Sequence, residues 1–130
     1  MKNLLLIFIA SFAIITLSST SAEAQWTKLG QRKVNFGVDH DEIMVTAYEG
    51  RFRKLKMEVR KAPIFIRNVK IVYGNGQSTN IKVNRRIDRN SETRAFDLPG
   101  DKRIIRKIVF NYKSVPNFRG KGLVVVHGKR

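Results

Sequence analysis

The sequence contains no cysteine, only three prolines and one tryptophan, and few acidic side chains. The absence of cysteine excludes disulfides, zinc–thiolate clusters, a cysteine nucleophile and a lipidated N-terminal cysteine. Lys and Arg number 26 against 10 Asp and Glu, so the formal net charge is +16. A chain of 130 residues is too short for more than one ordinary domain. Because 42% of its residues are hydrophobic, it has enough apolar surface to fold despite this charge.

No apolar run has the length of a membrane-spanning helix, but one near the start has the form of a secretory signal. Met1–Asn3 carries a positive charge, and Leu4–Leu17 is almost wholly apolar. That run is about 14 residues long, whereas a spanning helix needs roughly 20. Small polar residues follow, and Ala22–Ala24 fits the small-x-small cleavage pattern. We expect residues 1–24 to be a signal peptide and residues 25–130 to be one exported domain, periplasmic or extracellular. An uncleaved membrane anchor is the alternative.

Hydrophobic and polar residues alternate with period two in the rest of the chain. Lys54–Arg60 places Leu55, Met57 and Val59 on one face, which predicts a half-buried strand. Residues 69–73 and 79–85 repeat the pattern on either side of Gly74-Asn75-Gly76-Gln77. Asn-Gly between such runs predicts a hairpin in which both central turn residues have positive φ.

Other short strands are expected within 26–36 and at 42–47, 93–98, 103–112 and 123–127. Pro99-Gly100 suits a type II turn. Residues 103–112 are apolar on both faces, which indicates a central strand or a bulge near Arg106. The last run is apolar enough to be a buried strand. About eight short strands at this spacing predict an all-β antiparallel sandwich or barrel.

Three segments resemble a family of small exported bacterial β-domains of unknown function. They are Trp26–Gly30, Asp39–Ile43, and Phe96–Ile108 followed by Tyr112 and a valine-rich last strand. The resemblance covers most of residues 26–128 and rests on structural turns and strands. It implies a single β-sandwich of jelly-roll-like form, and it implies no catalytic residue and no cofactor.

The basic excess is the main indication of function. If strands 54–60, 69–73 and 79–85 are neighbours in one sheet, their outward lysines share a solvent face that attracts polyanions. The partners it would suit are anionic polysaccharide, lipopolysaccharide, anionic lipid head groups or nucleic acid. The alternative is a solvated face whose lysines prevent edge-to-edge aggregation. The predicted contact residues are Lys54, Lys56, Lys70, Lys82 and Arg85.

Aromatic side chains near strand ends are a second candidate site, because aromatic rings stack against sugars. Trp26, Tyr48 and Phe118 are the candidates for such carbohydrate stacking. Trp26 has an alternative role as a plug at one end of the sandwich.

Acidic residues offer little chemistry. Asp39–Glu42 is the one acidic cluster, but its spacing does not match a calcium loop, so no metal site is predicted. Asp39, Asp41, Glu49, Glu58 or Asp97 could supply a glycosidase carboxylate pair, yet no spacing selects one. The sequence therefore predicts an exported, non-enzymatic binding domain for an anionic envelope or extracellular polymer. A structural or protein-interaction module of the envelope is the alternative, and a glycan hydrolase is a more remote one.

Overall fold

The computed structural model describes residues 25–34, 40–45, 49–115 and 121–130. The expected signal peptide therefore lies outside the described residues. The described residues form ten strands and no helix, and three of the strands are two residues long. They are β1 (Trp26–Val34), β2 (His40–Met44), β3 (Arg51–Phe52), β4 (Lys54–Arg60), β5 (Ile64–Tyr73), β6 (Ser78–Ile87), β7 (Ser91–Glu92), β8 (Phe96–Asp97), β9 (Arg103–Ser114) and β10 (Gly122–Lys129).

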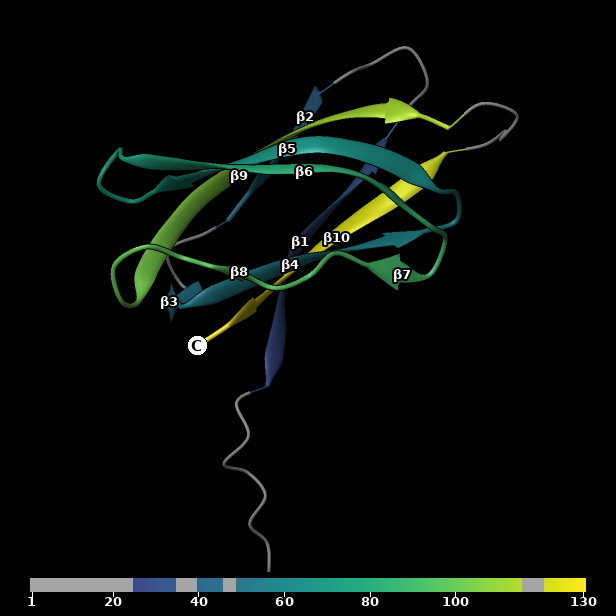
Figure 1. The fold of residues 1–130 in the computed structure, drawn as a ribbon. Coiled ribbons are helices and arrows are strands. Elements are labelled where there is room, and N and C mark those ends of the chain that lie inside the picture. Colours follow the sequence, from purple (N-terminus) through teal and green to yellow (C-terminus); the bar gives the residue numbers. More distant parts are fainter. Residues whose placement is uncertain (1–24, 35–39, 46–48, 116–120) are drawn as a thin grey trace, which may run out of the picture.

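Two antiparallel sheets pack face to face as the two layers of a sandwich (Figure 1). Sheet A has the order β1-β10-β4-β7, with β8 also on β4, and sheet B has the order β2-β9-β5-β6, with β3 also on β9. The first strand thus pairs with the last, and the second with the last but one, as in a jelly roll. The expectation of an all-β, jelly-roll-like sandwich is confirmed.

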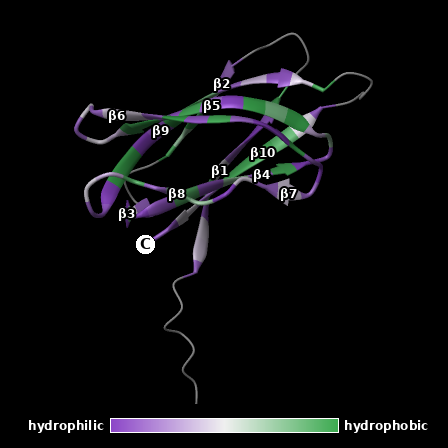
Figure 2. Ribbon diagram, in the orientation of Figure 1, coloured by the Kyte–Doolittle hydropathy of each residue, from purple (hydrophilic) through white to green (hydrophobic). Residues whose placement is uncertain are grey.

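The core lies between the sheets and follows from the alternation along each strand. The predicted inward residues of β4 in sheet A are buried, namely Leu55, Met57 and Val59. They belong to the same buried cluster as Ile71 and Tyr73 on the inner face of sheet B. Figure 2 shows hydrophobic residues concentrated on long strands such as β5 and β10 and hydrophilic ones in the turns and short strands. Each sheet thus has one buried face and one polar face, as expected for antiparallel sheets.

The long strand β9 is both central and bulged. It lies between β2 and β5, and its pairing with β5 shifts between Val72 and Tyr73. Arg106 is the extra residue, because Lys107 pairs with Val72 whereas Ile105 pairs with Tyr73. On the C-terminal side of the bulge the buried residues of β9 are at even positions, and on its N-terminal side the buried residue is Ile105. This change of phase explains why apolar residues occur at both even and odd positions of the strand.

The predicted hairpin between β5 and β6 is present, but its turn differs from the expected type. The amide of Gly76 donates to the carbonyl of Tyr73, and the amide of Tyr73 donates to the carbonyl of Gln77. Only Gly76 has positive φ, at 91°, and Asn75 does not. The loop is therefore a type I turn followed by a glycine bulge, which needs one left-handed residue instead of two.

Segment 91–97 corrects the strand expected at 93–98. It runs beside β4 and forms ladder pairs at both ends, through β7 and β8, while in between a single backbone hydrogen bond runs from the Thr93 amide to the Met57 carbonyl. At the gap the Thr93 hydroxyl accepts from the amide of Met57 and donates to the carbonyl of Arg94. The Thr93 hydroxyl replaces a backbone carbonyl as the acceptor for the Met57 amide. The edge segment is therefore divided into two very short strands, β7 and β8, instead of forming one.

The closing strand β10 is buried, as its composition predicted: Val124, Val125 and Val126 have no exposed surface. No helix within the described ranges is long and apolar enough to cross a membrane.

Candidate functional site: two basic faces

The predicted basic strip is divided between the two sheets. Strand β4 belongs to sheet A, whereas β5 and β6 belong to sheet B. Lys54 and Lys56 therefore lie on the outer side of one layer, and Lys70 and Lys82 on the outer side of the other. The premise that these three strands are neighbours was wrong, because the chain crosses between layers after Arg60.

On the outer side of sheet A, here called the A face, carboxylates hold Lys54, Lys56 and Arg60. Lys28 and Lys129 on the same face have no carboxylate partner among the described residues. Lys54 Nζ lies 3.3 Å from Asp97 Oδ1, and Lys56 Nζ lies 3.0 Å from Glu92 Oε1. Lys56 also lies over the Trp26 ring, 4.4 Å from its centroid, and its side chain is only 17% exposed. The lysines predicted as contacts on this face are thus already engaged within the protein.

A carboxylate in the middle of the A face binds two basic groups. Glu58 accepts hydrogen bonds from Arg60 at 3.0 and 3.1 Å, and its Oε1 lies 3.0 Å from His127 Nε2. The Arg60 hydrogen bonds, and after them the His127 contact, hold the pKa of Glu58 below its ordinary value of 4.5, although burial opposes them. The same pair raises the pKa of Arg60. Glu58 therefore stays ionised and neutralises its surroundings.

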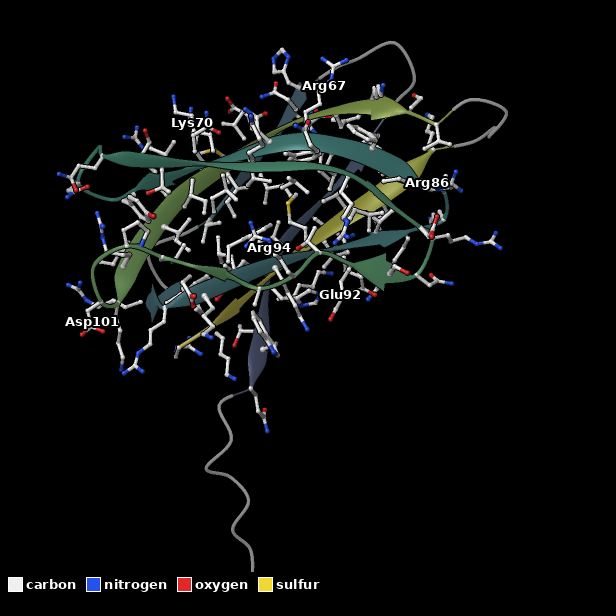
Figure 3. All side chains as sticks on the ribbon, viewed as in Figure 1. Arg67, Lys70, Arg86, Glu92, Arg94 and Asp101 are labelled. Carbon is white, nitrogen blue, oxygen red and sulfur yellow. The ribbon has the colours of Figure 1, made fainter. Side chains whose placement is uncertain are left out.

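The outer side of sheet B, here called the B face, is basic without this compensation. Pairing places Lys70 opposite Asn80 and Val109, and Lys82 opposite Asn68. Neither lysine has a carboxylate partner among the described residues. Figure 3 shows Arg67 and Lys70 on the side of sheet B that faces away from sheet A. The outward side chains of the B face are His40, Glu42, Met44, Phe65, Asn68, Lys70, Val72, Ser78, Asn80, Lys82, Arg86, Lys107, Val109, Asn111 and Lys113.

The few acidic groups at the B face lie at its margins. Glu42 on the edge strand β2 lies 3.5 Å from Lys107 Nζ. Asp88, just beyond β6, lies 2.8 Å from Arg86 Nε. Around Lys70 on β5 and Lys82 on the edge strand β6, no described carboxylate offsets the positive charge.

A polar hollow of about 330 Å³ opens on the B face, where two register shifts coincide. Between Ile66 and Asn68, β5 has one extra residue relative to β9, and β6 has two residues opposite that one. The backbone of Asn84 on β6 accommodates this with a positive φ of 46°. The bulges separate the strands locally, and the hollow is lined by Arg67, Asn68, Lys82, Asn84 and Asn111.

An asparagine relay forms the floor of the hollow. Asn111 Nδ2 donates to Asn68 Oδ1 at 2.6 Å, and Asn68 Nδ2 donates to Asn80 Oδ1 at 3.2 Å. The amide oxygen and the amide nitrogen of the Asn68 side chain are thereby both engaged in hydrogen bonds. In the part of the chain that the structure describes, the side chains of Arg67, Lys82 and Asn84 have no hydrogen-bond or ion-pair partner.

The remaining predicted site residues are dispersed. Arg85 pairs with buried Ile66, so it leaves β6 on the opposite side from Lys82. Trp26 is half-buried on the A face beneath Lys56 and Lys129. Tyr48 and Phe118 lie outside the described residues.

Three of the carboxylates considered for metal or glycosidase chemistry, Asp41, Glu58 and Asp97, bind basic or phenolic groups. Asp41 accepts from Arg32 Nε at 3.1 Å and from the Tyr112 hydroxyl at 2.9 Å, which links β1 and β9 across the two sheets. Glu58 and Asp97 are held on the A face, as described above. Asp39 lies outside the described residues. Among the described residues, no three His, Asp or Glu side chains are grouped to hold a metal ion.

Two further hollows lie at the ends of the sandwich. One, of about 410 Å³, contains Arg51, Tyr73 and Arg103. Arg103 there lies 3.9 Å from the Tyr73 ring centroid and donates to the Pro99 carbonyl and to Gln77, so its role is to fix the hairpin. The other, of about 290 Å³, is lined by Lys33, Lys61, Lys121 and Gly122.

Comparison with known proteins agrees with this architecture. Residues 4–128 match the family described as a domain of unknown function, DUF2541. The chain belongs to this family. The resemblance noted from the sequence is thereby confirmed, while export is not tested by it. No curated protein matches the DUF2541 chain.

Two solved structures are similar to the DUF2541 chain in fold. AlgX of Pseudomonas aeruginosa is 13% identical with a TM-score of 0.54, over 80% of this chain and 26% of the AlgX chain. The chain therefore spans about a quarter of AlgX. The SPBc2 prophage-derived protein YomS is 17% identical with a TM-score of 0.44, over 92% of this chain and 100% of its own. At such identities the AlgX likeness indicates a shared fold alone.

The sequence reasoning found Lys70 and Lys82 but missed Arg67, Asn68, Asn84 and Asn111. A signal was present, because the buried positions of β5 change from even to odd between Ile66 and Val69. That change of phase marks the bulge at which the hollow forms.

Proposed function

We propose that this DUF2541 protein is an exported, non-enzymatic binding domain that attaches to an anionic envelope or extracellular polymer through its B face. The observation that carries the proposal is the uncompensated charge of two neighbouring strands of that face, β5 and β6. Lys70 and Lys82 have no described carboxylate partner, whereas Lys54 and Lys56 on the A face have Asp97 and Glu92. A polyanion gains most from cations that no internal anion already neutralises.

The neighbouring side chains support attachment at the same place. Arg67 adds a further unpaired cation at the bulge, and Lys113 lies over the Phe65 ring at 4.8 Å with its charge exposed.

The test compares two variants with the same net charge. Lys70→Gln with Lys82→Gln, and Lys54→Gln with Lys56→Gln, each lower the formal charge from +16 to 16 − 2 = +14. The probes are duplex DNA, lipopolysaccharide and an acidic polysaccharide, titrated over a salt series. We expect the B-face variant to lower the slope of log affinity for DNA against log salt by about 2, because each contact contributes about 0.9.

The A-face variant is the matched control and should leave that slope nearly unchanged. Equal losses in the two variants would mean that net charge acts without a preferred face, and the proposed face would be wrong. Undetectable binding of the unmodified protein to every polyanion would refute the function itself and favour a structural or protein-interaction module. Circular dichroism confirms that both variants fold.

A further inference from the structure

The hollow at the double bulge contains more than positive charge, and its composition bears on which polyanion it fits. Two cations, Arg67 and Lys82, stand beside three amide side chains, Asn68, Asn84 and Asn111. A surface that served only electrostatic attraction would need lysine and arginine alone. The amides add both hydrogen-bond donors and acceptors at fixed positions.

The relay beneath the hollow holds these amides in place. Asn68 donates and accepts within the chain Asn111–Asn68–Asn80, so its orientation is fixed by two partners. Asn111 uses its amide nitrogen in this relay, and its carbonyl oxygen has no partner among the described residues. Asn84, held by its left-handed backbone at φ 46°, retains both its amide nitrogen and its oxygen.

The hydrogen-bonding groups that these side chains leave free fit a sugar better than a phosphate polymer. A hydroxyl group both donates and accepts, and therefore satisfies an amide oxygen and an amide nitrogen alike. A phosphate chain only accepts, so it would leave the Asn84 and Asn111 oxygens unmatched. The cations Arg67 and Lys82 require an anionic group beside those hydroxyls, and the Arg67 guanidinium matches a carboxylate or sulfate in two-point geometry.

We infer that the hollow formed by Arg67, Lys82, Asn84 and Asn111 is a binding subsite for an acidic sugar residue, one whose ring bears a carboxylate or sulfate next to free hydroxyls. This rests on the proposed function, because the surrounding B face supplies the general attraction for a polyanion. The hollow selects the acidic polysaccharide among polyanions: the anionic group binds Arg67 and Lys82, and ring hydroxyls bind the two asparagines.

The test removes the amide without changing the charge or the backbone. Asn84→Gly is suited to this, because glycine adopts positive φ freely and preserves the bulge. Asn90→Gly is the matched control, since Asn90 is also a left-handed asparagine, at φ 63°, in the turn after β6 and away from the hollow. Arg67→Lys is a second variant that keeps the charge and loses the planar fork.

The probes are a polyuronate, its methyl ester, a sulfated glycan and polyphosphate, each measured by calorimetry at low salt and near 1 M salt. At about 1 M salt the Debye length is about 3 Å, so long-range attraction is screened and short contacts remain. We expect salt-resistant binding of the polyuronate or the sulfated glycan, with little binding of the ester or of polyphosphate. Asn84→Gly should weaken that binding about tenfold, through two lost hydrogen bonds.

Asn90→Gly should bind as the unmodified protein does, and Arg67→Lys should lose affinity at high salt while keeping it at low salt. If Asn84→Gly binds acidic glycan undiminished, or if polyphosphate alone resists salt, the subsite assignment is wrong. The proposed function survives either result, provided that the low-salt binding still depends on Lys70 and Lys82. Thermal unfolding of each variant separates a lost contact from a lost fold.

Discussion

Both outer faces of this sandwich are rich in lysine and arginine, yet they differ in what lies beside those residues. On the A face, Asp97, Glu92 and Glu58 lie within 3.3 Å of Lys54, Lys56 and Arg60. On the B face, Lys70 and Lys82 are flanked by Asn80, Asn68 and Val109. Counting basic residues therefore says little about where uncompensated positive charge lies, because the positions of the few carboxylates decide it.

The topology explains how one sequence makes two such faces. Two acids of the A face, Glu92 and Asp97, come from segment 91–97, which runs along the outer edge of β4, and the third, Glu58, is in β4 itself. The edge strand β6 has no such neighbour among the described residues, and its Lys82 and bulge at Asn84 keep it from pairing with another chain. The same cations that protect the edge are thus the ones left available to a ligand.

The largest effect is expected from making the A face resemble the B face. Glu92→Gln with Asp97→Asn removes the partners of Lys56 and Lys54 and raises the formal charge from +16 to 16 + 2 = +18. Two newly available cations should increase DNA affinity by up to about 100-fold near 0.1 M salt and steepen the salt dependence. A filter-binding or anisotropy titration over a salt series measures both.

The control for this variant is Glu49→Gln with Asp101→Asn, which changes the charge equally and releases only Arg53, whose Nε lies 3.9 Å from the exposed Asp101 Oδ1. If the control raises affinity as much, the faces do not differ in function and net charge accounts for the attraction.

A smaller effect is expected from the reverse change, an acid placed on the B face. Asn80 lies opposite Lys70 and two residues from Lys82, so Asn80→Asp gives both lysines a partner while still accepting from Asn68. We expect DNA affinity to fall about tenfold, as for the loss of one phosphate contact near 0.1 M salt. Asn90→Asp is the control because it changes the net charge by the same amount away from both lysines. An equal fall in DNA affinity for Asn90→Asp would contradict the prediction.

Alternation along the chain was enough to predict most strands, because inward and outward positions are a local property. The residues buried on β4 and the hairpin between β5 and β6 followed from it. What it did not predict was partnership: Lys54–Arg60 and Ile64–Tyr73 are consecutive, yet the jelly roll places them in opposite layers. Pairing depends on contacts between segments far apart in sequence, such as Leu55 with Gly128, which no local pattern encodes.

The candidate site was only partly accessible to the same reasoning. Lys70 and Lys82 were found because they are outward lysines. Arg67 and Asn84 were not, because they lie at bulges where the period-two rule breaks down. Identification of Asn111 required knowing that β9 is the neighbour of β5.

A carboxylate on the A face should contribute more to the free energy of unfolding, and in a more pH-dependent way, than one on the B face. Glu58→Gln removes a carboxylate held by Arg60 and His127, which should lower the free energy of unfolding at pH 7 by about 1 kcal/mol. The pKa of Glu58 is lowered below its ordinary 4.5, so its contribution is fully present above pH 4.5 and is lost as pH falls through the lowered value. The difference from the unmodified protein should therefore vanish in strong acid.

Thermal unfolding at pH 7 and in strong acid measures this difference. Glu42→Gln on the B face, where Lys107 lies 3.5 Å away, is the comparison and should change stability at pH 7 by less than about 0.5 kcal/mol. A Glu58→Gln effect that is the same at both pH values would show that packing, not charge, holds this residue.

The smallest effect is expected where the chain passes from one layer to the other. The amide of Ala62 donates to the carbonyl of Arg60 at 2.9 Å, and Lys61 between them has φ 75°, so the crossing is a γ-turn that is strained for a residue with a side chain. Pro63 follows and keeps Ala62 extended, so the turn must fall on Lys61.

Lys61→Gly should relieve strain of about 1–2 kcal/mol, offset by about 0.5–1 kcal/mol of added freedom in the unfolded chain. The net result is a gain of about 0–1.5 kcal/mol, measurable by urea unfolding. Lys102→Gly, at a loop residue whose own φ is not positive, should instead lose stability by a similar amount. A loss at both positions would mean that the Lys61 side chain stabilises the crossing by more than its backbone strain costs.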